Sequence, residues 1–230
     1  MSLLQVHDVY RFYHVADEET RALRGVSLSV APGELVVLLG RSGSGKSTLL
    51  ASLAGLDDPN GGQIDIAGAR MSRRPEAWRA ELRAEHIGVM LQSGNLMPHL
   101  TVLDNALLTG TLLGRPDEAR ARDLLQQVGL GYRLHAYPSQ LSGGETARAG
   151  LVAALTHNPA VLLADEPTAE VDAETEDRVA GVIEAFVTQR DGPHCAVLAT
   201  HSTRLARRAD RVLTLHDGRW QDDSDASPSA

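Results

Sequence analysis

The sequence predicts an α/β fold in which a helical segment is inserted into a core built on a parallel sheet. Three observations support this prediction. Apolar runs typical of strands buried on both faces recur at 34–39, 87–91, 160–164 and 195–200. The stretch from 98 to 157 contains helical patterns only. Within residues 4–30, two segments instead alternate apolar and polar side chains, which indicates two further strands.

The other elements follow from hydrophobic periodicity and turn residues. Alternating or apolar segments predict further strands at 4–9, 23–30, 63–66 and 211–216. Apolar stripes at helical spacing predict helices at 46–54, 76–85, 102–113, 117–128, 144–156 and 174–189. A polar loop is expected at 17–21, and the acidic, Ser-rich segment 221–230 is expected to be a flexible tail.

Composition argues against several classes of protein. The 230 residues are 43% hydrophobic and 23% charged, with a formal net charge of −8, so a broad basic face for nucleic acid is not expected. The apolar runs are far shorter than the roughly 18 residues that a membrane helix needs. The N-terminus lacks a signal-peptide pattern, and Cys195 is the only cysteine, which excludes an intrachain disulfide. We therefore expect a cytosolic, soluble protein without a nucleic-acid partner.

The most specific motif lies between strand 34–39 and helix 46–54. It reads Gly40-Arg41-Ser42-Gly43-Ser44-Gly45-Lys46-Ser47-Thr48 and matches the phosphate-binding pattern G-x-x-x-x-G-K-[ST]. Glycines let backbone N–H groups cradle phosphate oxygens, and the helix N-terminus adds partial positive charge. The Lys46 ammonium is expected to reach the β- and γ-phosphates, and the Ser47 hydroxyl to ligate Mg²⁺. Lys46 is the only lysine among 22 basic residues, which indicates that a compact ammonium is required there.

Two carboxylates follow the strand at 160–164. Asp165 stands at the strand tip, where it can hold Mg²⁺ directly or through water. Glu166 comes next and can orient or deprotonate an attacking water. A solvated strand end would carry the same residues, but the phosphate loop upstream favours a nucleotide site.

A second glycine-containing helix start reads Leu141-Ser142-Gly143-Gly144-Glu145. Ser142 as N-cap, with Glu145 three residues later, forms a capping box. Together with the phosphate loop, Gln92, the acidic strand end and His201, this segment resembles the motif set of the ABC (ATP-binding cassette) ATPases. The resemblance runs from about residue 3 to 220 and implies a P-loop NTPase core, an N-terminal antiparallel β subdomain and an inserted all-helical subdomain.

The resemblance also implies domain boundaries. A single ABC ATPase domain would span 1–220, followed by the tail at 221–230. The β subdomain and P-loop core would comprise 1–92 and 158–220, and the helical signature subdomain 93–157.

For the nucleotide site, the resemblance implies ATP and Mg²⁺ as ligands. Gln92 matches the glutamine that senses Mg²⁺ and the γ-phosphate, and the metal would be held by Ser47, Gln92 and Asp165. Glu166, His201 and Lys46 would carry the catalysis, with His201 as the switch histidine at the γ-phosphate. ATP would otherwise be bound by the loop residues Gly40, Arg41, Ser42, Gly43, Ser44, Gly45, Lys46, Ser47 and Thr48.

Adenine would stack on an aromatic side chain near the N-terminus. Tyr13 matches the family position, while Tyr10 and Phe12 are rivals and ordinary strand packing is an alternative. The site would be completed across a head-to-tail dimer. Ser142, Gly143, Gly144 and Glu145 match the signature loop that closes on the γ-phosphate of the opposite subunit, and Asp172 matches the D-loop aspartate at the interface.

Several segments narrow the resemblance within the family. Residues 76–92, 95–100 and 54–57 resemble cytosolic ATPases of the lipoprotein-release, macrolide-export and cell-division type. Those proteins work with membrane subunits on a separate chain. The resemblance therefore implies an ATP-hydrolysing homodimer that binds a transmembrane permease at the inner face of the membrane and drives it by ATP-dependent closure.

Three positions depart from the family pattern. Glu145 replaces the usual Gln and is expected to place a carboxylate near the docking γ-phosphate, so that Glu145→Gln would tighten the dimer with little effect on monomer stability. Glu170 lies in the D-loop segment 169–172, and Ala153 stands where Arg is frequent. Glu145 and Glu170 favour an alternative, a module that binds ATP and barely hydrolyses it. A nucleic-acid-associated ATPase is a second alternative, but it predicts basic arms, zinc clusters or tandem cassettes, which the sequence lacks.

Overall fold

The computed structural model describes residues 2–15, 18–93, 95–169 and 171–221. Its larger sheet has the strand order β10-β9-β3-β8-β7-β6. These strands are β3 (Leu35–Leu39), β6 (Ile87–Met90), β7 (Val161–Asp165), β8 (Cys195–Ala199), β9 (Arg211–His216) and β10 (Arg219–Trp220). All neighbours pair in parallel except β10, which pairs antiparallel with β9. The predicted α/β class with a parallel-sheet core is therefore confirmed.

The smaller sheet is antiparallel, with the order β2-β1-β4-β5. Its strands are β1 (Leu4–Val15), β2 (Glu18–Val30), β4 (Gly61–Ile66) and β5 (Ala69–Arg70). The loop predicted at 17–21 was wrong for residues 18–21, because β2 already begins at Glu18 and pairs Tyr13 with Thr20. Backbone pairing does not need apolar side chains, so the hairpin continues past the point where the apolar alternation stops.

The helices are α1 (Lys46–Leu53), α2 (Glu76–His86), α3 (Val102–Leu112), α4 (Glu118–Gln127), α5 (Gly143–Leu155), α6 (Ala173–Thr188) and α7 (Thr203–Ala206), with a 3₁₀ turn η1 (Pro138–Gln140). The six predicted helices are all present, and each end differs by at most one residue. Capping explains part of this agreement, since Thr101 with Asp104 and Ser142 with Glu145 form capping boxes at α3 and α5. The elements that were not predicted, α7, η1, β5 and β10, are too short to show a period.

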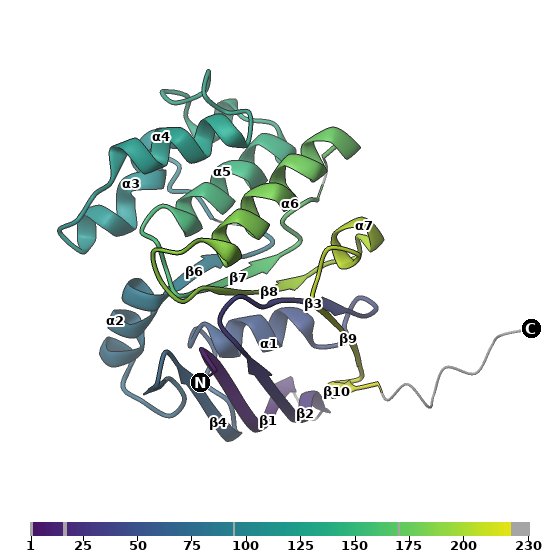
Figure 1. Ribbon diagram of the computed structural model, residues 1–230. Coiled ribbons are helices and arrows are strands. Elements are labelled where there is room, and N and C mark those ends of the chain that lie inside the picture. Colours follow the sequence, from purple (N-terminus) through teal and green to yellow (C-terminus); the bar gives the residue numbers. More distant parts are fainter. Residues whose placement is uncertain (1, 16–17, 94, 170, 222–230) are drawn as a thin grey trace, which may run out of the picture.

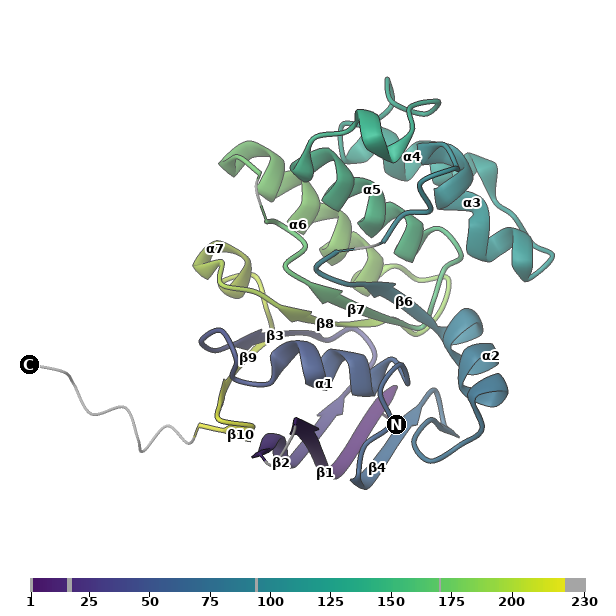
Figure 2. The same ribbon diagram turned by 180° about the vertical axis from the view of Figure 1, so that it is seen from behind.

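Two apolar cores lie on opposite faces of the larger sheet. Figure 1 shows the layers that enclose them, with α3–α6 on one face and α1 and the smaller sheet on the other. Alternate residues of β3 enter different cores, since Val36 and Leu38 face α1 and the smaller sheet, whereas Leu35 and Val37 face the layer of α3–α6. Burial on both faces explains the continuous apolar run. Helix α1 lies between the two sheets, as the view from behind also shows (Figure 2).

The parallel strands bring distant segments to one edge of the sheet. β3, β7 and β8 are parallel neighbours, so their carboxyl ends meet at that edge. The phosphate loop follows β3, Glu166 follows β7 and His201 follows β8 after one residue. Open α/β sheets bind ligands at the carboxyl ends of their strands, and this edge is therefore the expected place of a site. Within the described ranges, no helix is long and apolar enough to cross a bilayer.

Candidate active site

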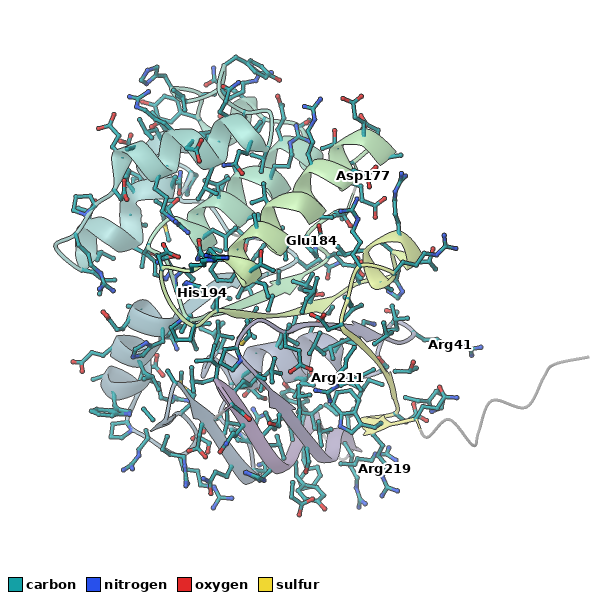
Figure 3. The ribbon with its side chains drawn as sticks, viewed as in Figure 1. Arg41, Asp177, Glu184, His194, Arg211 and Arg219 are labelled. Carbon is teal, nitrogen blue, oxygen red and sulfur yellow. The ribbon has the colours of Figure 1, made fainter. Side chains whose placement is uncertain are left out.

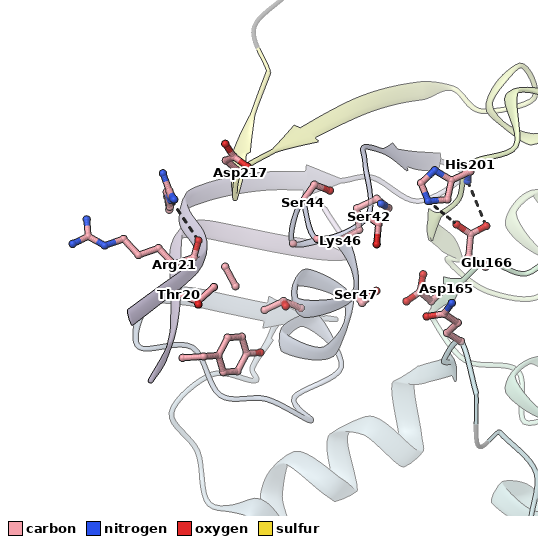
Figure 4. Close-up of a pocket in the computed structure, with 17 residues that line it drawn as sticks. Thr20, Arg21, Ser42, Ser44, Lys46, Ser47, Asp165, Glu166, His201 and Asp217 are labelled. Carbon is pink, nitrogen blue, oxygen red and sulfur yellow. Dashed lines mark hydrogen bonds and ion pairs between the residues drawn. The ribbon is translucent and has the colours of Figure 1, made fainter. Parts of the chain in front are cut away.

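A cavity of about 700 Å³ lies at this edge of the sheet (Figure 4). It extends from Tyr13 on the smaller sheet, past the phosphate loop, to the residues after β7 and β8. The sequence-predicted residues that line it are Tyr13, Ser42, Gly43, Ser44, Gly45, Lys46, Ser47, Thr48, Gln92, Asp165, Glu166 and His201. Tertiary structure thus gathers residues that span most of the sequence.

The phosphate loop holds its lysine by backbone oxygens. Lys46 is only 7% exposed, and its Nζ donates to the carbonyl oxygens of Gly40 at 2.7 Å and Arg41 at 3.1 Å. The N-cap of α1 is Gly45 in a left-handed conformation, with φ of 105°, and glycine has no side chain with which to cap the helix. A Cβ at Gly45 would collide with the carbonyl oxygen of Ala22. The loop therefore requires glycine here and leaves the helix N-terminus without a side-chain cap.

One buried polar atom of the loop supports a ligand at this place. The Ser44 Oγ is buried and has no hydrogen-bond partner within the part of the chain that the structure describes. Such an atom normally finds a partner, and a phosphate oxygen would provide one. Gly40 and Arg41 line a neighbouring cavity of about 710 Å³, and the Arg41 side chain extends outward from the loop (Figure 3).

The acidic end of the cavity is organised around Glu166. Its backbone has φ of 52°, a strained value for a residue with a side chain, and its N–H donates to the Ala199 carbonyl at 2.8 Å. Its Oε2 accepts from Thr200 Oγ1 at 3.1 Å and from the His201 N–H at 3.4 Å, while His201 Nε2 lies 3.6 Å from Oε1. Figure 4 shows this pair beside Asp165, which is only 6% exposed. The carboxylate is thus oriented by two residues that follow β8.

The donor set suits magnesium. Ser47, Gln92 and Asp165 line the same cavity, and Ser47 and Asp165 face each other (Figure 4). Hydroxyl, amide and carboxylate oxygens are hard ligands, and Mg²⁺ is usually held by one or two protein groups together with phosphates and water. The three predicted metal ligands therefore fit the ion by their chemistry and their placement.

Tyr13 is the aromatic side chain that reaches the cavity. Its hydroxyl donates to Asp57 Oδ2 at 2.5 Å, and the Arg11 guanidinium lies 4.7 Å from its ring centroid. Tyr10 and Phe12 pack with each other, with ring centroids 6.2 Å apart. Alternate residues of a strand face opposite sides, so Tyr13 lies on the other side of β1 from its two rivals.

The signature residues Ser142–Glu145 lie apart from this cavity, at the N-terminus of α5. The capping box is present, because Glu145 N donates to Ser142 Oγ at 3.2 Å and Ser142 N to Glu145 Oε2 at 2.9 Å. The other carboxylate oxygen accepts from the Tyr132 hydroxyl at 2.8 Å and Arg133 Nε at 3.0 Å. The Ser142 N–H, with help from these two side chains, lowers the pKa of Glu145 to about 2. The carboxylate is therefore bound within its own helical layer.

Asp172 also lies apart from the cavity. It is the N-cap of α6, where its side chain accepts from Thr175 N at 2.8 Å, and this backbone N–H lowers the pKa of Asp172. Glu170, the other acidic departure in the D-loop, lies outside the described residues, as does the predicted tail from 222 onward.

Sequence analysis missed several residues of the site. Thr20, Arg21, Ala22, Arg24 and Asp217 line the cavity, and Thr200 orients Glu166. Asp217 precedes Gly218 in the turn between β9 and β10, a turn signal that the sequence does contain. That turn meets the phosphate loop only in three dimensions, where Gly218 N donates to the Ser44 carbonyl.

Comparison with known proteins identifies the family. The ABC transporter family model matches residues 23–169, more than half of the chain. The chain belongs to the ABC transporter family. The predicted resemblance to ABC ATP-binding subunits is therefore confirmed.

Two curated relatives match nearly the whole of this chain. The uncharacterized ABC transporter ATP-binding protein YbbA of Escherichia coli K12 is 42% identical over 226 residues, which cover 97% of this chain and 98% of YbbA. The lipoprotein-releasing system ATP-binding protein LolD 2 of Caulobacter vibrioides is 40% identical over 94% of this chain and 95% of its own. The second relative is of the lipoprotein-release type that the sequence resembles.

A solved structure matches the ABC fold in three dimensions. It is the dimeric structure of a post-hydrolysis state of the ATP-binding cassette MJ0796 bound to ADP and Pi. Its TM-score is 0.89 at 30% identity, with 95% of this chain and 97% of that chain covered. This likeness confirms the predicted ABC ATPase fold.

Proposed function

We propose that this chain binds and hydrolyses Mg·ATP and drives a separate membrane subunit of an ABC complex. The observation that carries the proposal is the single cavity that gathers Lys46, Asp165 and an oriented Glu166. Family membership supports the same activity. Phosphoryl transfer depends mostly on positioning and charge neutralisation, and the residues of this cavity supply both.

Each residue has a proposed role. The Lys46 ammonium neutralises the β- and γ-phosphates, while Ser47, Gln92 and Asp165 hold Mg²⁺, which adds positive charge when bound. Glu166 directs the attacking water and accepts its proton. His201 contacts the γ-phosphate beside Glu166.

We propose that the site is completed by a second copy of the chain. Ser142–Gly144 lie outside the cavity on α5, as does Asp172 on α6, and a head-to-tail dimer would bring them to the partner's nucleotide. The dimeric state of the MJ0796 cassette supports this arrangement. We propose that one domain spans 1–220, with the core at 1–92 and 158–220 and a helical subdomain at 93–157 that closes on ATP.

The membrane subunit is proposed to contact a groove of about 300 Å³ between α2, α3 and α5. Met97 and Leu112, which are 45% and 77% exposed, line this groove. The groove and the cavity are close along the chain, since Gln92 lines the cavity and Asn95, three positions later, lines the groove. Asn95 also binds both backbone groups of Leu91, at 2.7 and 2.6 Å. Such a contact would place the chain in the cytoplasm, at the inner face of the membrane.

Glu166→Gln tests the activity. We expect MgATP binding to persist, turnover to fall by about 100-fold or more, and ATP to trap a dimer that sedimentation detects. Wild-type turnover should disappear when Mg²⁺ is chelated. Turnover near the wild-type level in Glu166→Gln would remove Glu166 from catalysis, and a wild-type protein that binds ATP without hydrolysing it would favour a nucleotide-dependent binding module.

Leu112→Glu tests the groove. We expect this variant to sediment no longer with the membrane fraction of the cells in which it is produced. Its ATP turnover in solution should stay unchanged. Val212→Glu is the matched control, because Val212 is also exposed, at 44%, but lies on β9 away from the groove. Equal membrane association of both variants and wild type would contradict the assignment of the groove.

A further inference from the structure

A polar cluster links Tyr13 to the far end of the phosphate-loop helix. Asp57 follows α1 closely, and its N–H donates to the Ala51 carbonyl of that helix at 3.2 Å. Its carboxylate accepts the Tyr13 hydroxyl at 2.5 Å and Arg11 Nε at 2.8 Å, and its second oxygen forms an ion pair with Arg11 Nη2. The side chains of Arg11 and Asp57 are each only 21% exposed. The C-terminal end of α1 is therefore tied to the Tyr13 ring.

Arg11 restrains the same ring from one face. Its guanidinium lies 4.7 Å from the ring centroid, a cation–π distance. Arg11 is itself held by Nη1 donating to Asn60 Oδ1 at 3.2 Å, and that oxygen also accepts from the Phe12 N–H at 2.8 Å. The position of the ring is thus fixed at the hydroxyl by Asp57 and at one face by Arg11.

We propose that Arg11 and Asp57 are positioning residues that hold the Tyr13 ring as a platform for the nucleotide base. This inference rests on the proposed function, because it assumes that ATP occupies the cavity. Helix α1 then positions both ends of the nucleotide. Its N-terminal loop receives the phosphates, and Asp57 beyond its C-terminus fixes the ring on which the base stacks.

The expected energetic role is pre-ordering of the ring. A side chain that is mobile before binding must be immobilised when the base stacks on it, which weakens binding by about two- to tenfold for one side chain. Asp57 and Arg11 immobilise the ring in advance. Removing the contacts of Asp57 and Arg11 with Tyr13 should therefore weaken the binding of ligands that carry a base. The binding of ligands that carry only phosphates should not change.

Two matched ligands separate this role from a structural one. MgATP and magnesium tripolyphosphate are titrated into wild type, Tyr13→Phe, Asp57→Asn and the double variant. We expect each single variant to weaken ATP binding about two- to tenfold. The double variant should lose no more than Asp57→Asn alone, because Asp57 acts on the ring through both the Tyr13 hydroxyl and Arg11. Tripolyphosphate affinity should stay within twofold throughout.

Asp58→Asn is the control, since Asp58 is the neighbouring carboxylate but binds Arg73 N at 2.8 Å instead of Tyr13. It should leave both affinities unchanged. If Asp57→Asn does not fold, Tyr13→Phe and Arg11→Lys carry the same test.

Three results would overturn the inference. Equal weakening of ATP and tripolyphosphate binding would show that Asp57 only maintains the structure around α1. Unchanged ATP affinity in all variants would show that the contacts with Tyr13 do not contribute to binding. Additive losses in the double variant would show that the two groups act separately. Failure of the ATP binding on which the inference rests would look different, since wild-type protein would then bind neither ATP nor tripolyphosphate.

Discussion

Two helices of the molecule begin with glycine-rich sequences, and their N-termini are satisfied in opposite ways. At α1 the N-cap is Gly45 in a left-handed conformation, which has no side chain to offer as a cap. At α5 the N-cap is Ser142, and its capping box with Glu145 occupies backbone groups of the first turn. The free N–H groups of a helix N-terminus attract either an anion or a capping side chain. The comparison shows that glycine content alone does not distinguish these outcomes.

The charged side chains near the two helix N-termini also differ. The first side chain of α1 is the buried Lys46, whose ammonium lies in the cavity lining. The acidic residue of α5, Glu145, is bound by Tyr132 and Arg133 of the preceding loop. The first turn of α1 contains no acidic residue, whereas the first turn of α5 contains Glu145. Four predictions test this difference, from the largest expected effect to the smallest.

Lys46→Arg should weaken MgATP binding by about 10- to 100-fold, nearly as much as Lys46→Ala. Lys46 is 7% exposed, its ammonium lies between the carbonyls of Gly40 and Arg41, and a planar guanidinium does not fit there. Titration calorimetry measures the loss. Arg122→Lys on the exposed face of α4 is the reverse exchange and should have no effect; wild-type affinity in Lys46→Arg would show that charge alone is sufficient at α1.

Glu145→Gln should lower the free energy of unfolding by about 1 to 2 kcal/mol, measured by urea denaturation of the nucleotide-free protein. The variant loses the ionic bond to Arg133 and part of the capping box. The sequence alone predicts tighter ATP-driven dimerisation and little change in stability. Because Arg133 neutralises the carboxylate, we expect the substitution to change the free energy of ATP-driven dimerisation less than the free energy of unfolding. An unchanged unfolding curve with a much tighter dimer would restore the sequence-based expectation.

The contribution of Glu145 to the free energy of unfolding should decrease as the pH is lowered. Its pKa is lowered from 4.5 to about 2 in the folded chain, so the stabilisation is complete above pH 4.5 and is lost as pH falls through about 2. The difference in unfolding free energy between wild type and Glu145→Gln should therefore shrink over this range. A difference that stays constant between pH 6 and about 2.5 would exclude the carboxylate as its source.

Ser142→Ala should produce the smallest effect, a loss of about 1 kcal/mol in unfolding free energy. It removes the acceptor of the Glu145 N–H while the carboxylate keeps Tyr132 and Arg133. Ser142→Asp, which preserves a capping oxygen, should recover most of the loss. Equal destabilisation by both substitutions would argue that Ser142 does not act as a cap.

Much of the molecule could be predicted from local sequence patterns. The six longer helices and the α/β class follow from periodicity, and the phosphate loop follows from a motif whose residues are contiguous. The capping box of α5 was predicted for the same reason, since its two partners are three residues apart. Patterns of this kind depend only on the chain's near neighbours. The extent of the β1–β2 hairpin was missed because its outer part is held by backbone pairing without an apolar alternation.

The sequence by itself determined the elements, the phosphate loop and the resemblance to a family, because each rests on residue type and spacing. Only the tertiary structure decided which face of β1 meets the cavity, and therefore that Tyr13 reaches it instead of Tyr10 or Phe12. It also decided the direction of the Glu145 carboxylate and the meeting of Asp57 with Tyr13. These outcomes depend on how sheets and helices pack. Packing brings together residues that are far apart in the sequence, and no local sequence pattern indicates that they will meet.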